Sequence, residues 1–372
     1  MNGKPQNAHT LQAVFIARAN VEYRIRQRRK CRMMKAILSR PSGGFGLCEV
    51  EPPSIGPGEL LVEMRACGLC GTDLAKLATP QKSRGASLGH EMAGVVREVG
   101  PGVTRFAPGD RVVAAHHVPC DTCWACRHGN ESMCPQFKAT NIDPCGFADL
   151  IRIPRLHTER VTIPLHDGMS YDVASFTEPL ACAVRAVQRS QVLPGDRIAV
   201  IGGGGMGLLI AQTVAARGAE PVVLDISEAR LALASALRIR TTINPSRADA
   251  QEVVAKMTKG TGLDGAILTV VSEPILGQVQ QALRPGGRIN IFAGPTDGPR
   301  LPVDLADLFY RELAIFSTYS STPAALGEAF ELLARNRVSV LPLISHRLPL
   351  AAFEEGVELQ RSGAATKVIF HP

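Results

Sequence analysis

Aromatic residues and long apolar runs are scarce in this sequence. Aromatic side chains occupy 5% of the 372 positions, and tryptophan occurs once. No apolar stretch approaches the roughly 20 residues needed to cross a bilayer, so we expect no membrane-spanning segment and no membrane partner. The hydrophobic content of 45% and the charged content of 20% are typical of a globular enzyme. A chain of this length favours two domains over one.

The body of the chain also lacks net charge. The formal net charge is +7 at pH 7, but residues 1–32 alone contain eight basic residues and one acidic residue. Residues 33–372 are therefore neutral in sum. A neutral body has no general attraction for a phosphate backbone, so we expect no nucleic-acid partner.

The basic segment at residues 1–32 has three interpretations. The first is a mitochondrial-type presequence, although such segments are usually Ser-rich and this one contains no Ser. The second is a basic helix for an anionic surface. The third is an appendage that results from a start codon assigned too early. We favour the appendage, with the fold beginning at Met33 or Met34, because Lys35–Leu38 has the pattern of a first strand. Removal of residues 1–32 is then predicted to leave turnover intact.

Four of the ten cysteines lie in one short segment. Cys120, Cys123, Cys126 and Cys134 have the spacing C-x2-C-x2-C-x7-C. Four thiolates this close can surround one tetrahedral Zn²⁺ at about 2.3 Å, which leaves no position open and makes such a site structural. Disulfides and an iron–sulfur cluster are the alternatives. Because no secretory signal pattern accompanies these cysteines, we favour zinc, reduced thiols and a cytoplasmic location.

The pattern of strands and helices changes along the chain. Residues 35–180 contain many short strands separated by Gly and Pro, which predicts a compact, barrel-like β domain. From Pro194 onward apolar strands alternate with helical stretches, which predicts a parallel sheet covered by helices. A helix at Pro323–Arg337 and a last strand at Thr366–Phe370 follow. We therefore predict four segments: a basic extension at 1–32, a zinc-containing catalytic domain at 33–182, an NAD-binding domain at 183–318, and a return to the catalytic domain at 319–372.

A glycine-rich turn follows the first apolar strand of the second half. The run 197–201 enters a segment in which three glycines fill the pattern G-x-G-x-x-G: Gly202, Gly204 and Gly207. An apolar helix at 208–217 and a second strand at 222–224 supply the context that a dinucleotide-binding turn requires. The free N–H groups at the start of that helix are then available to a pyrophosphate.

Asp225 closes the second strand, about 20 residues after the turn. A carboxylate at this position binds the ribose hydroxyls and repels a 2′-phosphate, so we predict NAD rather than NADP. Arg230 lies one helical turn further on, and an arginine there could reduce the preference for NAD over NADP. A kinetic preference for NADP would contradict the assignment of Asp225.

A thiol, an imidazole and a carboxylate lie close together in the first half. Cys70 lies within Cys67-Gly68-Leu69-Cys70-Gly71-Thr72-Asp73, and the other two groups come from Gly89-His90-Glu91. These ligand types suit Zn²⁺, and three protein ligands leave the open position that a catalytic zinc needs. A buried cysteine and a core histidine are the alternative interpretation.

Taken together, these motifs resemble the zinc-dependent medium-chain dehydrogenases, the family of alcohol, sorbitol (polyol) and threonine dehydrogenases. The resemblance begins near residue 33, continues to the C-terminus, and also covers Glu178-Pro179-Leu180-Ala181 and Arg284-Pro285-Gly286-Gly287-Arg288. It implies an α/β fold in which a GroES-like, β-rich catalytic domain is joined to a doubly wound Rossmann domain. It also implies a homodimer or homotetramer.

The resemblance further implies roles for individual residues. Cys70 (rather than Cys67), His90 and Glu91 would hold a catalytic zinc. Glu178 matches a carboxylate of the polyol and threonine branch, which binds the metal directly, or through water while Glu91 coordinates. Both arrangements stay open.

Two more positions match functional residues of the family, and others depart from it. Thr72 matches the hydroxyl residue that hydrogen-bonds the substrate oxygen, and Lys367 matches a basic residue near the cofactor pyrophosphate. Many relatives carry a relay histidine where this chain has Ala75. We interpret His116 and His117 as packing or surface residues rather than as members of a relay.

The predicted reaction is the reversible oxidation of a secondary, polyol-like alcohol to its ketone. Hydride passes to NAD, and zinc acts as a Lewis acid. With the four-cysteine segment included, we expect two zinc ions per chain. The alternatives are a metal-free, NADPH-dependent quinone or enone reductase on the same fold, and a non-catalytic binding protein stabilised by zinc. Metal analysis would separate these possibilities.

Overall fold

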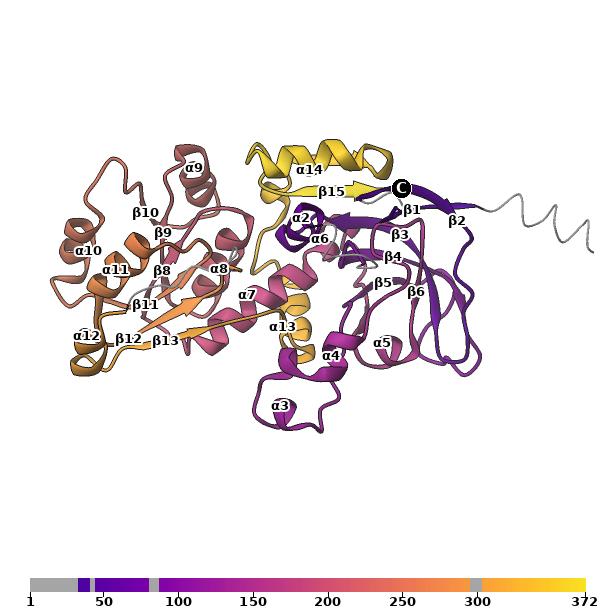
Figure 1. Ribbon diagram of the computed structural model, residues 1–372, viewed down its shortest axis with the longest axis horizontal. Coiled ribbons are helices and arrows are strands. Elements are labelled where there is room, and N and C mark those ends of the chain that lie inside the picture. The colour runs from indigo at the N-terminus through magenta and orange to yellow at the C-terminus, as the bar shows by residue number, and fades with distance from the viewer. Residues whose placement is uncertain (1–32, 41–43, 80–86, 295–302) are drawn as a thin grey trace, which may run out of the picture.

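The computed structural model describes residues 33–40, 44–79, 87–294 and 303–372 (Figure 1). Within these ranges the chain forms two large sheets and one two-stranded sheet, with helices around them. No helix in the described part of the chain is both long and apolar enough to cross a membrane. The predictions about residues 1–32 concern a segment outside the described residues.

The first large sheet has seven strands and joins the N-terminal half of the chain to its C-terminal end. The strand order is β14-β15-β3-β4-β5-β7, with β6 also paired to β3. The bounds are β3 (Leu60–Gly68), β4 (Glu91–Val99), β5 (Arg111–Ala114), β6 (Leu150–Ile153), β7 (Thr162–Pro164), β14 (His346–Pro349) and β15 (Val368–His371). A separate hairpin contains β1 (Met34–Ser39) and β2 (Phe45–Val50). The short-strand pattern thus correctly predicted a β-rich first half, and the last strand pairs with β3.

The second large sheet has six parallel strands in the order β10-β9-β8-β11-β12-β13. The bounds are β8 (Arg197–Ile201), β9 (Glu220–Leu224), β10 (Thr241–Ile243), β11 (Leu263–Leu268), β12 (Leu283–Ile291) and β13 (Ala314–Ser317). Numbered from β8, this is the order 3-2-1-4-5-6 of doubly wound dinucleotide-binding folds. The strand order reverses between β8 and β11. Ligands of such sheets bind at the carboxyl ends of the strands at this reversal point.

Helices cover both faces of the parallel sheet and connect the two sheets (Figure 1). Those of the parallel sheet are α8 (Gly205–Ala216), α9 (Glu228–Ala236), α10 (Ala250–Thr258), α11 (Glu273–Ala282) and α12 (Leu305–Tyr310). The others are α2 (Gly71–Ala78), α3 (Trp124–Arg127), α4 (Pro135–Ala139), α5 (Arg155–Arg160), α6 (Tyr171–Ser175), α7 (Thr177–Arg189), α13 (Pro323–Ala334) and α14 (Phe353–Arg361), with short 3₁₀ turns η1 (Glu131–Met133), η2 (Leu341–Leu343) and η3 (Leu350–Ala352). The predicted helix at Pro323–Arg337 therefore ends three residues early, where Asn336 takes a left-handed conformation (φ 51°).

One hydrophobic core extends from the β-rich sheet to the parallel sheet. Helix α7 packs against both α8 and α13. Val184 of α7, Leu208 of α8 and Phe330 of α13 belong to the same buried cluster as Ala66 and Ala93 of the first sheet. Because protein interiors are close-packed, this shared core holds the glycine turn before α8 at a defined position relative to β3 and β4.

Candidate active site

The register of two strands brings the candidate metal ligands together. In the antiparallel pair β3–β4, Gly68 lies opposite Glu91. Cys70 follows two residues after Gly68 and is the N-cap residue of α2, while His90 directly precedes β4. The thiol, the imidazole and the carboxylate therefore meet at one end of the sheet. One ligand atom from each of the three side chains lies within 4.8 Å of the others.

Asp73 holds both halves of this arrangement. Its carboxylate accepts hydrogen bonds from Cys70 N at 3.2 Å and from Gly89 N at 3.0 Å, and it lies 3.6 Å from His90 Nδ1. Burial raises the pKa of Asp73, but the neighbouring His90 and the hydrogen bonds outweigh it and lower the pKa below its usual value. A carboxylate against one ring nitrogen orients the imidazole and leaves the other nitrogen for a ligand.

Lys367 and Glu91 form a buried ion pair beside the candidate ligands. The Lys367 ammonium contacts the Glu91 carboxylate and also donates to the Leu69 carbonyl at 3.0 Å. Both side chains are buried. The resemblance assigned Lys367 to the cofactor pyrophosphate. In the structure Lys367 lines a cavity together with Glu91 and Gly204, and its ammonium is paired with the Glu91 carboxylate.

Glu178, in the first turn of α7, is a buried carboxylate without an ion-pair partner in the described part of the chain. It is 4% exposed, and the one hydrogen bond that reaches it there comes from the Cys182 thiol, with Sγ 3.6 Å from Oε1. Burial raises the pKa of Glu178, and the nearby Glu91 raises it further, against the opposing effect of His90. Glu178 faces the same site from a different element, although it is not part of the three-residue group within 4.8 Å.

This donor set fits a divalent cation. Three buried carboxylates, from Asp73, Glu91 and Glu178, surround the site, whereas Lys367 is the one buried ammonium that pairs with them among the described residues. Buried charge without compensation is costly, so a cation between Cys70, His90 and the carboxylates would complete the site. Sulfur, nitrogen and oxygen donors together suit Zn²⁺ better than Mg²⁺ or Ca²⁺.

The surroundings of the donor set include one hydroxyl and several imidazoles. Thr72 Oγ1 lies 3.4 Å from His90 Nε2. Ala75, also on α2, provides no titratable group. The His116 ring instead lies against His90, with ring centroids 4.7 Å apart, and the His117 ring lies against His116 at 3.9 Å, tilted by 44°. Of the two histidines that we interpreted as packing or surface residues, His116 packs beside a candidate metal ligand and His117 packs on His116.

The glycine turn has the geometry expected for a dinucleotide. Gly202 takes a left-handed conformation (φ 100°), and α8 begins directly after Gly204, its N-cap residue. A Cβ at Gly207 would collide with the carbonyl oxygen of Gly202. The turn therefore needs glycine at positions 202 and 207 to bring the first N–H groups of α8 to the carboxyl end of β8.

Asp225 is buried at the end of β9 and fixed by backbone groups. Its two carboxylate oxygens accept from Gly203 N at 2.7 Å and from Ser227 N at 2.8 Å. Arg230 Nη1 lies 3.4 Å from the same carboxylate. Asp225 thus stabilises the glycine turn itself, and Arg230 partly offsets its negative charge where a ribose 2′-position would lie.

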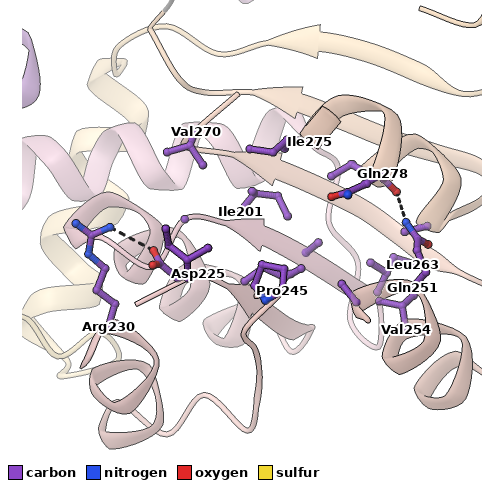
Figure 2. Close-up of a pocket in the computed structure, with 17 residues that line it drawn as sticks. Ile201, Asp225, Arg230, Pro245, Gln251, Val254, Leu263, Val270, Ile275 and Gln278 are labelled. Atoms are coloured by element: carbon purple, nitrogen blue, oxygen red, sulfur yellow. Dashed lines mark hydrogen bonds and ion pairs between the residues drawn. The ribbon is translucent and has the colours of Figure 1, made fainter. Parts of the chain in front are cut away.

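Two cavities with common lining residues lie between Asp225 and the donor set. A largely apolar cavity of about 330 Å³ is lined by Ile201, Asp225, Pro245 and Ile275, among others (Figure 2). A second cavity of about 270 Å³ is lined by residues that include Cys70, Glu91, Gly204 and Lys367. Both share the lining residues Gly202, Arg230 and Val270. An elongated ligand can therefore place an aromatic base in the first cavity and its other end beside Cys70.

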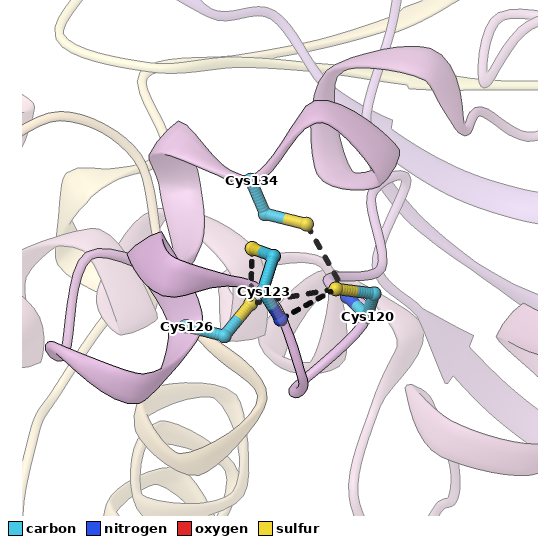
Figure 3. A group of neighbouring side chains, drawn as sticks. All are labelled: Cys120, Cys123, Cys126 and Cys134. Atoms are coloured by element: carbon cyan, nitrogen blue, oxygen red, sulfur yellow. Dashed lines mark hydrogen bonds between the residues drawn. The ribbon is translucent and has the colours of Figure 1, made fainter.

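The four-cysteine lobe, residues 120–134, is a second centre. Figure 3 shows the four thiols pointing toward one another, and their sulfur atoms all lie within 4.8 Å. The distances are 3.5 Å for Cys123–Cys126 and 4.0 Å for Cys120–Cys126. These are too long for a disulfide, at about 2.05 Å. They bracket the separation of about 3.8 Å for four sulfurs bound tetrahedrally at 2.3 Å.

Thiol protonation in the lobe also favours a bound cation. Hydrogen bonds from Thr122 and from Cys123 N lower the pKa of Cys120 to about 6. Burial and the adjacent sulfurs raise the pKa of Cys126 to about 12. Four thiolates cannot form together at neutral pH unless a positive charge lies between them, which Zn²⁺ would supply. No disulfide forms among the nine cysteines that the structure describes.

Several residues of these sites had no role assigned from sequence. Asp73 is the last residue of the motif at 67–73, but its contacts with Gly89 and His90 depend on the pairing of β3 with β4. Gln360 of α14 lines the cofactor cleft, where its Nε2 donates to the Leu69 carbonyl at 3.3 Å and its Oε1 is buried without a partner among the described residues. Cys182 lies four residues after Glu178, a helical spacing that could have indicated a shared face.

Two family models match the chain. The alcohol dehydrogenase GroES-like domain matches residues 56–164, and the zinc-binding dehydrogenase model matches residues 205–335. Among curated proteins, the L-threonine 3-dehydrogenase of Bacillus velezensis is 32% identical over 354 residues, which cover 91% of this chain and 99% of the relative.

Solved structures show the same architecture. A protein described as a zinc-binding dehydrogenase from Sinorhizobium meliloti, with bound NADP, superposes with a TM-score of 0.83 at 27% identity, covering 92% of this chain and 100% of that one. An alcohol dehydrogenase from Thermus sp. ATN1 gives a TM-score of 0.79 at 27% identity, covering 91% of this chain and 99% of that one.

Proposed function

Because the chain belongs to the zinc-dependent medium-chain dehydrogenase family, we propose that it oxidises a secondary, polyol-like alcohol with NAD and reduces the matching ketone in the reverse direction. The observation that carries this proposal is the pair of cavities that share lining residues, one beside Asp225 and the other beside the glycine turn and the donor set. It joins the place for a dinucleotide to the place for a reacting alcohol.

We propose Cys70, His90 and Glu91 as the residues that hold the catalytic zinc, with Glu178 as a further carboxylate ligand, direct or through water. When bound there, zinc would supply Lewis-acid polarisation of the alcohol oxygen. Asp73 orients His90, and Lys367 controls the position of the Glu91 carboxylate through their ion pair. The four thiols of the lobe would hold a second, structural zinc.

The other residues of the site position the reactants and the proton. Thr72 Oγ1 is next to His90 and is the hydroxyl we assign to accept the proton of the substrate alcohol while it passes its own proton on, through the ribose hydroxyls of the cofactor and water, to solvent. The glycine turn and α8 hold the pyrophosphate, while the apolar cavity beside Asp225 takes the adenine. Gln360 lines the same cavity as Cys70 and Gly204. Its Oε1, which has no hydrogen-bond partner among the described residues, would accept from a ribose hydroxyl of the cofactor.

We propose NAD as the preferred cofactor, with measurable use of NADP. The Asp225 carboxylate repels a 2′-phosphate, and the adjacent Arg230 guanidinium attracts it. Replacement Arg230→Ala should therefore raise the ratio of kcat/KM for NAD to that for NADP by about 5-fold. An unchanged ratio would show that Arg230 does not take part in cofactor discrimination.

We also propose a homodimer or homotetramer, in a cytoplasmic location. β13 lies at the edge of the six-stranded sheet, and Phe309 and Tyr310 of the neighbouring α12 are 75% and 82% exposed. An edge strand beside exposed aromatic side chains is suited to pairing with a second copy. Light scattering of the purified protein measures the oligomeric state. The location rests on the described cysteines, which form no disulfide.

A panel of secondary alcohols with NAD, followed by NADH absorbance, tests the function. The protein is assayed as purified, after removal of metal by a chelator, and after zinc is restored. We expect about two zinc ions per chain, loss of turnover with the catalytic zinc, and recovery on its return. Full turnover by metal-free protein would refute the proposal. The metal-free reductase and the non-catalytic protein are not favoured, because the donor set is complete.

A further inference from the structure

Glu178 and Cys182 lie one helical turn apart at the start of α7. Residues at positions i and i+4 share a face of a helix, and side chains lean toward the helix N-terminus, so the Cys182 thiol is directed back toward Glu178. The structure shows this contact, with Cys182 Sγ donating to Glu178 Oε1 over 3.6 Å. Phe176 and Pro179, on either side of Glu178 in the chain, line the same cavity as Cys70. This end of α7 therefore faces the donor set.

The two oxygens of the Glu178 carboxylate have different surroundings. Oε1 accepts from the Cys182 thiol, whereas no group among the described residues donates to Oε2. Oε2 is nevertheless not one of the fully enclosed, unpaired side-chain atoms of the described chain, so it stays reachable from the site. A buried carboxylate with one oxygen fixed and the other oxygen open has the form of a metal ligand that an outer partner orients.

The donor to Glu178 differs in kind from the donor to Glu91. The Lys367 ammonium pairs with the Glu91 carboxylate and compensates its charge. The Cys182 thiol is a weak, uncharged donor, which can orient the Glu178 carboxylate but cannot compensate its charge. Because Glu178 is buried, its charge still requires a cation nearby. The thiol thus fixes the direction of this carboxylate without competing with a metal for it.

Cys182 also differs from the other thiols outside the lobe. In the described part of the chain, Cys48, Cys67 and Cys145 direct their sulfur atoms to backbone carbonyls. Cys182 directs its sulfur to a carboxylate that we propose as a metal ligand. Most thiols in protein interiors behave as small apolar groups, so a carboxylate acceptor indicates a role beyond packing.

We propose that Cys182 is a positioning residue of the catalytic metal site, which fixes Oε1 of Glu178 and thereby presents Oε2 to the metal of the donor set. This inference rests on the proposed function and adds to it a residue that acts through Glu178. Partners that orient a metal ligand typically contribute 10- to 100-fold to metal affinity. Because a thiol is a weak donor, the contribution of Cys182 should lie near the lower end, at about 10-fold.

The test compares two substitutions for which a positioning role and a packing role predict opposite results. Cys182→Val keeps a compact apolar side chain but removes the donor, whereas Cys182→Ser keeps a donor. Zinc per chain is measured in a series of zinc buffers, in which the ion of the four-cysteine lobe serves as an internal reference. To keep the active-site ion, Cys182→Val should need about 10-fold more free zinc than the wild type, and Cys182→Ser less than about 3-fold more. A packing role predicts the reverse order.

A double variant shows whether Cys182 acts through Glu178. Glu178→Gln removes the charge that the thiol orients, so Cys182→Val added to it should weaken zinc binding by less than about 2-fold further. Cobalt(II), put in place of the active-site zinc, reports on its ligands through its visible absorption. The cobalt spectrum of Cys182→Val should differ from that of the wild type, and the spectrum of Cys182→Ser should not.

Cys48→Val is the matched control. The Cys48 thiol donates to the Gly46 carbonyl at 3.4 Å and belongs to neither donor group. The same chemical change at this position should leave both the zinc affinity and the cobalt spectrum of the active site unchanged. The three single cysteine variants should melt close to the temperature of the wild type.

Four results would overturn the inference. Two concern the single variants: wild-type zinc affinity in Cys182→Val, or weaker zinc binding by Cys182→Ser than by Cys182→Val. The others are a full 10-fold loss when Cys182→Val is added to Glu178→Gln, and an equal loss of affinity in Cys48→Val. In each case zinc-dependent turnover by the wild type would leave the proposed function standing. A wild type that binds no zinc beyond that of the lobe would instead refute the proposed function, and this inference with it.

Discussion

The two cysteine-based centres of this protein are built in opposite ways. The lobe draws four identical donors from the 120–134 segment, and they close around one point. The active site combines sulfur, nitrogen and oxygen from the start of α2, the start of β4 and the start of α7, with Lys367 added from the C-terminal end. A closed set of like donors suits a structural ion, and a mixed, open set with buried charges around it suits chemistry.

This difference also separates what each centre contributes to the molecule. The lobe consists of α3, η1 and short loops, with little apolar side chain of its own to form a core. We therefore expect its fold to depend on a bound metal. The active site lies at the ends of β3 and β4, which are held by an extensive core whether or not an ion is present. We therefore expect loss of the lobe metal to act on stability, and loss of the active-site metal to act on the rate.

The largest expected effect comes from breaking the lobe with Cys123→Ser. A structural zinc supplies on the order of 10 kcal/mol to the folding of small metal-dependent units, so the lobe should unfold when one thiolate is lost. We expect one zinc per chain, a fall in melting temperature of about 10 °C or more, and new proteolytic cleavage within 120–134. Differential scanning fluorimetry and limited proteolysis measure these changes.

Cys48→Ser is the control for that experiment. Cys48 is a half-buried thiol on β2, whose Sγ donates to the Gly46 carbonyl at 3.4 Å, and it has no place in either centre. Its replacement should change the free energy of unfolding by less than about 0.5 kcal/mol. If Cys123→Ser kept two zinc ions and the wild-type melting temperature, the lobe would not be a metal-dependent unit.

The next effect is the converse, produced by Cys70→Ser in the active site. Without its thiolate the mixed donor set should lose its zinc, and kcat/KM should fall by about 10³-fold or more, which corresponds to roughly 4 kcal/mol of transition-state stabilisation. NADH binding should persist, because the glycine turn and Asp225 do not depend on Cys70. Steady-state kinetics, fluorescence titration of NADH and zinc analysis test these three points.

Cys67→Ala, in the preceding strand β3, is the matched control. The Cys67 side chain is fully buried in the hydrophobic core of the first sheet, three positions before Cys70. Its replacement should cost some stability but leave the zinc content and kcat within about 2-fold of the wild type. The opposite result, a normal enzyme from Cys70→Ser and a metal-free one from Cys67→Ala, would mean that the thiolate was assigned to the wrong cysteine.

The same contrast explains which parts of the molecule could be predicted from sequence. The lobe and the glycine turn are contiguous motifs whose spacing carries their geometry: the structure brings the four thiols together and begins α8 after Gly204. The family and the two-part α/β fold are likewise confirmed. The ion pair between Lys367 and Glu91 joins positions 276 residues apart, and no local pattern announces it.

His116 and Asp225 show two further limits of sequence reasoning. The place of His116 next to His90 follows from the register of β4 and β5, which neither strand specifies alone. Asp225 was correctly placed at the end of β9, but spacing could not show that its oxygens accept from Gly203 N and Ser227 N. In both cases the missing information is tertiary: strand pairing in one, loop backbone geometry in the other.

A smaller effect is expected from Asp73→Asn. This substitution changes the surroundings of the proposed active-site metal but none of its proposed ligands, and so refines the comparison of the two centres. The amide keeps the shape of the side chain but loses the charge that faces His90. Groups that orient a ligand typically contribute 10- to 100-fold to metal affinity, so we expect zinc at this site to be lost at correspondingly lower chelator concentrations. The lobe should keep its ion.

Asp110→Asn controls for the loss of a carboxylate that accepts from the backbone. Asp110 accepts from Ala107 N at 2.8 Å in a surface turn and belongs to neither donor set. Its replacement should leave the chelator sensitivity of the enzyme unchanged. Equal sensitivity of the Asp73 and Asp110 variants would show that the charge of Asp73 does not support the metal.

The smallest effect concerns Arg185, a buried side chain of α7 that contacts the lobe. Arg185 lies on α7, two helical turns after Glu178, and it donates to the Tyr319 carbonyl at 2.9 Å and to the lobe at the Gly129 carbonyl, 3.4 Å away. Burial lowers the pKa of Arg185, which means that the desolvation of its charge offsets part of the stability that its hydrogen bonds contribute.

Arg185→Met should therefore destabilise the protein by only about 1 kcal/mol, seen as a decrease of about 2 °C in melting temperature. Because Glu178 is held by the first turn of α7 and by the core, kcat should change less than about 2-fold. A large fall in kcat at normal zinc content would show instead that the lobe sets the position of Glu178 through this helix, and that the two centres act as one.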